Sequence, residues 1–215
     1  YIQGIHAIIS GNKIIGNNKM GIYIWLRISS ALIEDNQISN CTTGIWADAG
    51  AGASDMQIVR NAVFNNNIGL YLWCPVDVRD NTVSNNSIGI EGILSTFHNN
   101  NIANNTSLNF YNLWLADIDA THNWWGTTQI QAINQTIFDK KNDSITGQVD
   151  FMSFLTAPNP KAPAIPVNIS PISIVTPESF ITTHSQTDSF LAEIVIVSAI
   201  AIGVGLLVYY KKYKH

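Results

Sequence analysis

Short stretches in which apolar and polar residues alternate recur along the first 125 residues of the chain. In four of these stretches, two apolar residues stand five and three positions before an Asn. The pairs are Ala7/Ile9, Ala31/Ile33, Met56/Ile58 and Val76/Val78. Alternation with a period of two is typical of a β-strand that faces a core on one side. The pattern therefore predicts many short strands.

Each stretch leads into a longer repeated unit. The unit reads Asn-x-apolar, then Asn or Cys two or three residues later, then Gly-apolar, as in residues 81–90. The lead residues, 24, 25, 20, 19 and 23 positions apart, are Asn12, Asn36, Asn61, Asn81, Asn100 and Asn123. In the unit that begins at Asn100, Asn109 takes the Gly position, and we expect a positive φ there because Asn tolerates it best after Gly. A drifting period of about 22 residues predicts a solenoid with one unit per coil.

The residues at the fixed positions distinguish between two kinds of solenoid. A leucine-rich repeat would need several Leu and a helix in each unit, whereas Asn, Ile or Val, and Gly are fixed here. Three short strands per coil, with turns at the Asn and Gly positions, predict an all-β parallel β-helix. Its coils stack at roughly 4.8 Å, so that equivalent apolar side chains form interior columns. Equivalent Asn side chains can then hydrogen-bond from coil to coil.

These residues carry a resemblance to a known family. Over residues 1–156 the chain resembles the right-handed parallel β-helix repeat proteins of the NosD-like and pectate-lyase-like superfamily, particularly the surface-anchored versions common in archaea. The segment from Asn123-Trp-Trp-Gly126 to Gly147-Gln-Val-Asp-Phe151 is similar to the C-terminal closing segment of these proteins. The resemblance implies a right-handed solenoid with a C-terminal cap. The NosD-like resemblance also implies copper handling as a candidate function, and a copper site would require clustered Met, Cys and His. Because the three Met and two Cys are scattered, we predict no cofactor and no metal.

The pattern divides the chain into five parts. Residues 1–126 form the coils, and 127–156 form a cap with a short helix and a strand. Residues 157–188 hold six of the seven prolines and predict an extended stalk. Residues 189–210 predict a transmembrane helix, and 211–215 a basic cytoplasmic tail. Because the sequence starts within a repeat, we expect it to be the C-terminal part of a longer protein.

The transmembrane prediction rests on length and charge. Between residues 190 and 210 the only charged side chain is Glu193. A helix of that length spans a hydrocarbon core of about 30 Å. Lys211, Lys212 and Lys214 follow at once, so the positive-inside rule predicts a cell-membrane protein with a cytoplasmic C-terminus and an extracellular β-helix.

The cap prediction rests on apolar spacing. Ile130, Ile133 and Ile137 stand at i, i+3 and i+7, which predicts a short helix with one apolar face on the last coil. Thr127 or Thr128 is the expected N-cap. Residues 147–155 alternate and predict a final strand.

Charge limits the classes of function. The net charge of −4 argues against a nucleic-acid partner, which requires a basic face. Candidate catalytic residues are Asp35, Asp48, Asp77, Asp80, Asp117, Asp119, Arg60, Arg79, His98 and His122. Asp35, Arg60 and Asp80 stand one residue before lead Asn positions and predict a surface ladder of alternating sign. We interpret His98 and His122 as solvated turn residues and residues 47–55 as a flexible loop rather than a calcium site. No catalytic residue is assigned.

A sharper signal follows the Gly-apolar pairs. If the apolar residue points inward, the next residue and the one two positions further point outward. The outward residues are Tyr23, Trp46, Tyr71, Glu91 and Tyr111, and then Trp25, Asp48, Trp73, Ile93 and Leu113. We call eight of them the aromatic platform: Tyr23, Trp25, Trp46, Asp48, Tyr71, Trp73, Glu91 and Tyr111. Aromatic faces with nearby acceptors suit sugar rings. Alternatively, Tyr and Trp are simply good strand formers, or a neighbouring surface covers them.

Two classes of function follow from these features. The first is a non-catalytic membrane-anchored surface protein whose aromatic platform binds cell-envelope polysaccharides or surface proteins. The second is an extracellular polysaccharide lyase or hydrolase, since enzymes of the resembled superfamily cut acidic polysaccharides with clustered carboxylates. A charged cluster on one sheet face would favour the enzyme, and an aromatic stripe without converging charges would favour binding.

Overall fold

The computed structural model describes residues 6–16, 18–25, 30–48 and 55–166. The chain divides into two units, Tyr1–Val167 and Asn168–His215, and all of the described residues belong to the first. The predicted transmembrane helix 189–210 and the basic tail 211–215 lie outside the described residues. So do residues 167–188 of the predicted stalk.

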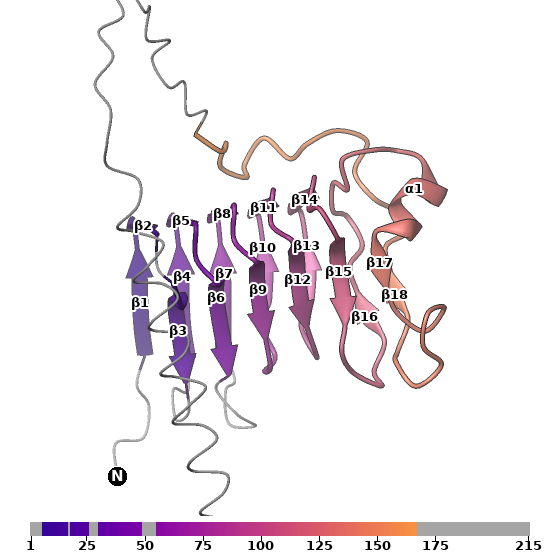
Figure 1. Cartoon of the computed structure of the whole chain (residues 1–215), viewed down its shortest axis with the longest axis horizontal. Helices are drawn as coiled ribbons and strands as arrows, with labels where there is room; N and C mark the ends of the chain where they lie inside the picture. The colour runs from indigo at the N-terminus through magenta and orange to yellow at the C-terminus, as the bar shows by residue number, and fades with distance from the viewer. Residues whose placement is uncertain (1–5, 17, 26–29, 49–54, 167–215) are drawn as a thin grey trace, which may run out of the picture. The chain divides into compact units, whose positions relative to one another are not determined.

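Fifteen short strands follow one another as five successive sets of three. The sets are β1 (His6–Ser10), β2 (Lys13–Ile15) and β3 (Met20–Trp25); β4 (Ser30–Glu34), β5 (Gln37–Ser39) and β6 (Thr43–Asp48); β7 (Asp55–Val59), β8 (Ala62–Phe64) and β9 (Ile68–Leu72); β10 (Asp77–Arg79), β11 (Thr82–Ser84) and β12 (Ile88–Gly92); and β13 (Thr96–His98), β14 (Asn101–Ala103) and β15 (Leu108–Asn112). Each strand pairs in parallel with its equivalents in the neighbouring sets, and Figure 1 shows the sets side by side as coils. The predicted β-solenoid with three strands per coil is confirmed.

Three parallel sheets result from this stacking. The first contains β1-β4-β7-β10-β13, the second β2-β5-β8-β11-β14, and the third β3-β6-β9-β12-β15 with one further strand. The inner face of each sheet carries a column of apolar side chains with no exposed surface. The columns are Ile33, Ile58, Val78 and Phe97; Ile38, Val63, Val83 and Ile102; and Ile45, Leu70, Ile90 and Phe110. The inward register predicted from the repeat is therefore confirmed.

One turn of every coil is held by a ladder of the lead Asn residues. Asn81 is fully buried, and its backbone N–H and side-chain Nδ2 donate to Oδ1 of Asn100 at 2.9 and 3.0 Å. Its own Oδ1 accepts the same two bonds from Asn61 at 2.8 and 3.0 Å. Nδ2 also donates to the carbonyls of Ile58 and Arg79. An amide can do this because it carries donors and acceptors together.

A second ladder runs along the turn before the third sheet. Asn66 donates to Oδ1 of Asn86, and Asn86 donates to Oδ1 of Asn105, at 2.9–3.0 Å. At the last coil the ladder turns to Asn109, whose Oδ1 accepts from Nδ2 of Asn105 at 2.9 Å. Asn109 in turn donates to the Thr136 hydroxyl at 3.1 Å. The side chain of Asn109 therefore ends this ladder.

The reason for Gly in each repeat differs from the one we expected. The glycines at this position are not at positive φ, and neither is Asn109. Nine non-glycine residues of the described part that directly precede a ladder position take positive φ instead: Asp35, Asn40, Arg60, Asn65, Asp80, Asn85, Asn99, Asn104 and His122. A Cβ on Gly69 would lie 2.5 Å from the Gly89 carbonyl oxygen and 2.9 Å from Val83 Cγ1. Gly is needed because the next coil approaches closely.

The segment after the fifth coil contains β16 (Ile118–Asp119), α1 (Ile130–Gln135), β17 (Ile137–Phe138) and β18 (Val149–Asp150). β17 pairs with β15 and extends the third sheet, and β18 pairs with β16. Figure 1 shows α1 next to β17 at this end. The predicted final strand is therefore only two residues long.

The predicted helix differs from α1 in two respects. The expected apolar face is wrong at Ile130, which is 50% exposed. It is also wrong at Ile137, because α1 ends at Gln135 and Ile137 belongs to β17. The N-cap is Gln129 without a side-chain bond, so neither predicted Thr caps the helix. Thr127 instead accepts a hydrogen bond from the backbone N–H of Gln129 at 3.2 Å.

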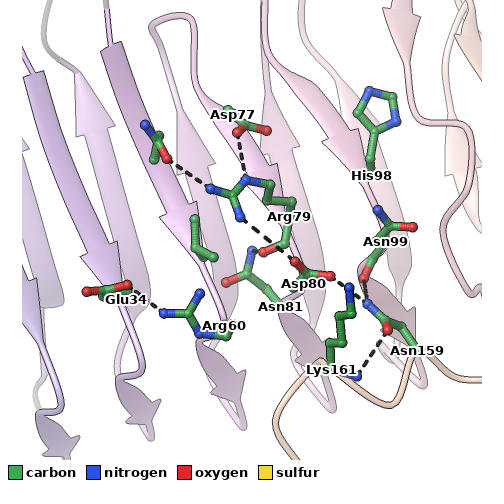
Figure 2. Close-up of polar contacts among 12 residues, drawn as sticks. Glu34, Arg60, Asp77, Arg79, Asp80, Asn81, His98, Asn99, Asn159 and Lys161 are labelled. Atoms are coloured by element: carbon green, nitrogen blue, oxygen red, sulfur yellow. Dashed lines mark hydrogen bonds and ion pairs between the residues drawn. The ribbon is translucent and has the colours of Figure 1, made fainter.

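The first ten residues of the predicted stalk, 157–166, lie on the outer side of the solenoid. The backbone of Asn159 exchanges two hydrogen bonds with the side chain of Asn101, at 2.7 and 3.2 Å. Its Nδ2 donates to Oδ1 of Asp80 at 2.8 Å and to the Asn99 carbonyl at 2.5 Å (Figure 2). The Pro163 carbonyl accepts from the Thr82 hydroxyl at 2.7 Å. This portion thus differs from the predicted extended stalk because its polar groups are satisfied by the coils.

The close approach at Gly69 predicts a steep cost for one added methyl group. Gly69→Ala would place Cβ against backbone and a core Val, which costs about 1–3 kcal/mol or more. Gly92→Ala is the matched control, because its Cβ would make only ordinary contact with Leu72 at 3.4 Å. Chemical denaturation of both variants measures the difference in the free energy of unfolding. Equal losses would contradict the close-approach explanation.

The ladder predicts a strong difference between two isosteric substitutions. Asn81→Asp removes the Nδ2 donor and places a carboxylate opposite the acceptors Asn100 Oδ1 and the Ile58 carbonyl. We expect a loss above about 1–3 kcal/mol, since a buried unsatisfied polar group costs that much and a charge costs more. Asn85→Asp at an exposed positive-φ position should stay within about 0.5 kcal/mol. Thermal unfolding with similar shifts for both variants would show that the ladder contributes little.

Candidate functional site

The outer face of the third sheet carries the predicted row of aromatic and acidic side chains. Because the five strands pair in register, the residue after each inward apolar residue meets its equivalent in the next coil. The successive partners are Tyr23, Trp46, Tyr71, Glu91 and Tyr111. The residues of the aromatic platform are therefore brought together in the predicted order, while their role as a ligand site stays a prediction.

The rings of this row are packed edge to face. The ring centroids of Tyr23 and Trp46 are 5.3 Å apart with an interplanar angle of 64°, and those of Trp46 and Tyr71 are 4.8 Å apart at 69°. Such T-shaped pairs stabilise neighbouring coils beyond the area that they bury. The rings of these three residues are therefore inclined to one another rather than coplanar.

Exposed aromatic faces occur in the second row, two residues further along each strand. Trp25 is 57% exposed and stacks on Tyr23 at 6.2 Å with an interplanar angle of only 14°. Trp73 is 38% exposed and lies 6.0 Å from Tyr71. Asp48 pairs in register with Trp25 and stands at the equivalent position before Trp73. One carboxylate therefore lies between two exposed indoles.

The second row ends after Trp73. Ile93 was expected to point outward but is only 5% exposed. Its N–H donates to the Leu72 carbonyl at 3.0 Å, and the next residue, Leu94, turns outward at a φ of 53°. The turn after β12 therefore places Leu94 rather than Ile93 at the surface, where it is 50% exposed.

The two carboxylates of the aromatic platform are uncompensated. Within the described part of the chain, the carboxylate of neither Asp48 nor Glu91 forms a hydrogen bond or an ion pair. Partial burial raises the pKa of Glu91 above its ordinary value. Burial also raises the pKa of Tyr71, although its hydrogen bond with Trp73 opposes this. The charges of Glu91 and Asp48 raise that pKa further, which means that both act near the Tyr71 hydroxyl.

A comparison with protein families agrees with this geometry. The family model described as "Right handed beta helix region" matches residues 1–110, which is just over half of the chain. The chain belongs to the right-handed β-helix family. No curated protein and no solved structure matches the chain.

Residues that the sequence did not single out extend the outer row of this right-handed β-helix. Phe138 pairs with Tyr111, and their rings lie 4.8 Å apart at 71°. The pair Ile137-Phe138 repeats Phe110-Tyr111, but it stands 14 residues after its lead Asn123 instead of 9 or 10, because α1 lies between them. Trp114 is also exposed, at 43%, in the turn after β15.

The predicted surface ladder is only partly formed on the right-handed β-helix. Arg60 donates to both carboxylate oxygens of Asp35 at 2.9 Å. It also donates to Glu34 at 2.6 Å (Figure 2). Asp80 instead accepts from Asn159 and lies 3.9 Å from Arg79. The side chains of Asp35 and Arg60 are 48% and 40% exposed, so these pairs contribute little to stability.

The prediction of solvated turn residues holds for the exposed His122, whereas His98 ends strand β13 and is half-buried beside it. Their ring centroids are 6.4 Å apart, and Nε2 of His98 is 3.7 Å from Oδ2 of Asp119. Burial raises the pKa of Asp119, but two hydrogen bonds from Thr121 and the electrostatic attraction of His98 and His122 lower it, and the net pKa is lowered. Thr121 contacts both rings, since its carbonyl oxygen lies 3.2 Å from Nδ1 of His98 and its hydroxyl lies 3.0 Å from Nδ1 of His122.

The remaining predictions concern metals and the membrane. Among the described residues, no group of three or more His, Cys, Asp or Glu could hold a metal ion. Within the same residues, no helix is long and apolar enough to cross a membrane. Most of the loop 47–55, namely residues 49–54, lies outside the described part.

Proposed function

We propose that this right-handed β-helix is a non-catalytic cell-surface module whose aromatic platform binds polysaccharides of the cell envelope. The observation that carries the proposal is the pair of exposed indoles, Trp25 and Trp73, with the uncompensated carboxylate of Asp48 between them. Indole faces take the C–H faces of sugar rings, and carboxylate oxygens accept their hydroxyl hydrogens. The parallel strands hold all three side chains on one rigid sheet.

The repeat of the solenoid favours a polymer over a small molecule. Trp25 and Trp73 are two coils apart, so their backbones are separated by roughly 9–10 Å along the axis. A ligand with its own repeating unit can engage both positions. Each contact on a shallow face is weak, and several contacts along one polymer gain strength together.

The proposal includes an anchor and a cap. The apolar segment 189–210 followed by three Lys supports a single membrane span with the β-helix outside the cell. The pairing of β17 with β15 and the burial of Ile133 and Ile137 support a cap over the last coil. A cap of this kind protects the apolar core and leaves only a two-residue edge strand.

Removing the two exposed indoles of the aromatic platform is expected to weaken polysaccharide binding. In Trp25→Ala/Trp73→Ala, affinity of the full chain for a panel of soluble glucans and amino-sugar polymers should fall about 5- to 150-fold, since each of the two aromatic contacts is worth about 0.5–1.5 kcal/mol. Trp114→Ala, which removes an exposed indole outside the platform, is the matched control. Affinity electrophoresis measures binding and circular dichroism checks folding.

Two results of that experiment would overturn the proposed function. The first is unchanged polysaccharide binding in a folded double variant. The second is cleavage of polygalacturonate by the wild-type chain, which would establish the alternative, an extracellular lyase or hydrolase.

The proposed topology predicts the result of protease treatment of intact cells that express the full chain. Protease should release the β-helix by cutting between residues 167 and 188, because an extracellular Pro-, Ser- and Thr-rich segment is accessible. Immunoblotting against the β-helix and against a C-terminal tag follows both parts. Retention of the β-helix on treated cells whose control surface proteins are removed would contradict the topology.

A further inference from the structure

The aromatic pair Tyr71 and Trp73 lies between two acidic side chains that come from different coils. Glu91 of β12 is the register partner of Tyr71 on one side. Asp48 of β6 stands opposite Trp73 on the other side, because Ala47 pairs with Leu72. Both carboxylates thus flank one aromatic pair from the coil before and the coil after.

Among the residues that the structure describes, no basic side chain neutralises these two charges. The described ion pairs use Arg60, Arg79, His98 and Lys141, and all of them join other carboxylates. The outer row that contains Tyr71 continues through Tyr111 to Phe138 without a basic residue. Two like charges therefore act together at a partly buried aromatic pair, and a cation bound there would relieve the cost of desolvating Glu91.

This arrangement has the chemistry of an ammonium site. The face of an aromatic ring attracts a cation through its quadrupole, most strongly for Trp. A carboxylate adds charge-assisted hydrogen bonds to an ammonium group. An anionic polymer such as a uronate would instead be repelled by both carboxylates.

We propose that the ligand of the aromatic platform is a polymer of amino sugars with free ammonium groups, bound where Tyr71 and Trp73 lie between Asp48 and Glu91. The inference rests on the proposed function and names the chemical class of its ligand. Sugar rings fit better than a flexible basic peptide because Trp25 and Tyr23 continue the surface with nearly parallel rings. The ammonium groups would supply the charge complementarity that neutral sugars lack.

The test compares two oligosaccharides that differ in N-acetylation and therefore in charge. Isothermal titration of the full chain in detergent uses glucosamine oligomers and N-acetylglucosamine oligomers of equal length. The glucosamine oligomers should bind at least tenfold more tightly, and the difference should shrink as salt is raised. Asp48→Asn/Glu91→Gln should remove most of this preference.

A charge-matched control separates local from global electrostatics. Asp117→Asn/Asp150→Asn removes two exposed carboxylates elsewhere and keeps the oxygens that accept from the N–H groups of Gln148 and Met152. Its affinity for glucosamine oligomers should change less than twofold. An equal loss in both double variants would mean that only net charge matters, and would overturn the site.

Folding of the Glu91 variant has an expected sign. Because burial raises the pKa of Glu91, ionisation costs stability as the pH rises through that raised pKa. Glu91→Gln should therefore be at least as stable as the wild type at pH 7, with the advantage lost at pH values below the ordinary range of Glu. A binding loss in this variant then reports on the ligand contact.

Each remaining outcome decides between the two proposals. Equal affinity for both oligomers, lost in Trp25→Ala/Trp73→Ala, would refute the ammonium site and leave polysaccharide binding intact. Absence of binding to any sugar polymer would refute both. Tighter binding of polylysine than of glucosamine oligomers with the same number of charges would identify a basic protein as the partner and overturn the amino-sugar ligand.

Discussion

The structure depends on amide hydrogen bonds that pass from one coil to the next. A parallel solenoid buries a turn in every coil, and a buried turn leaves backbone groups that β-ladders do not satisfy. Asn meets this need because one side chain accepts from the preceding coil and donates to the following coil and to nearby carbonyls. Since every coil repeats this bond set, the coils keep one spacing and one register. The apolar columns and the outer rows then follow from that register.

Close stacking also determines which residues can occupy the second turn. The carbonyl oxygen of the next coil lies where a Cβ of Gly44, Gly69 or Gly89 would stand. Only the last coil allows a side chain at this position, and Asn109 uses it to end the second ladder. Positive φ occurs elsewhere, at the residue before each ladder position. Gly and Asn thus solve different problems in this fold, although both are common in turns.

The proposed ligand face is a consequence of parallel pairing in the third sheet. Identical positions of successive repeats meet, so a preference for aromatic residues at one position becomes a row. Differences between repeats become local features of that row. Glu91 in place of an aromatic residue and Asp48 in place of a Trp put two carboxylates beside the same aromatic pair. The solenoid therefore carries variation without a change of fold, because the outward positions do not contribute to the ladders.

The sequence by itself determined the solenoid, its three strands per coil, the inward columns and the order of the platform residues. These features depend on the alternation of apolar and polar residues within each repeat and on the constant spacing between repeats. Both can be read from the sequence, and every further repeat reinforces them. Four other features depend on contacts between residues distant in the sequence. They are the orientation of the aromatic rings, the turn that buries Ile93, the packing of residues 157–166 against the coils and the pairing of Phe138 with Tyr111. Only the tertiary structure decided them. The repeat predicts the features that all coils share, whereas packing at the end of the solenoid and on its outer surface depends on the particular side chains that come into contact there.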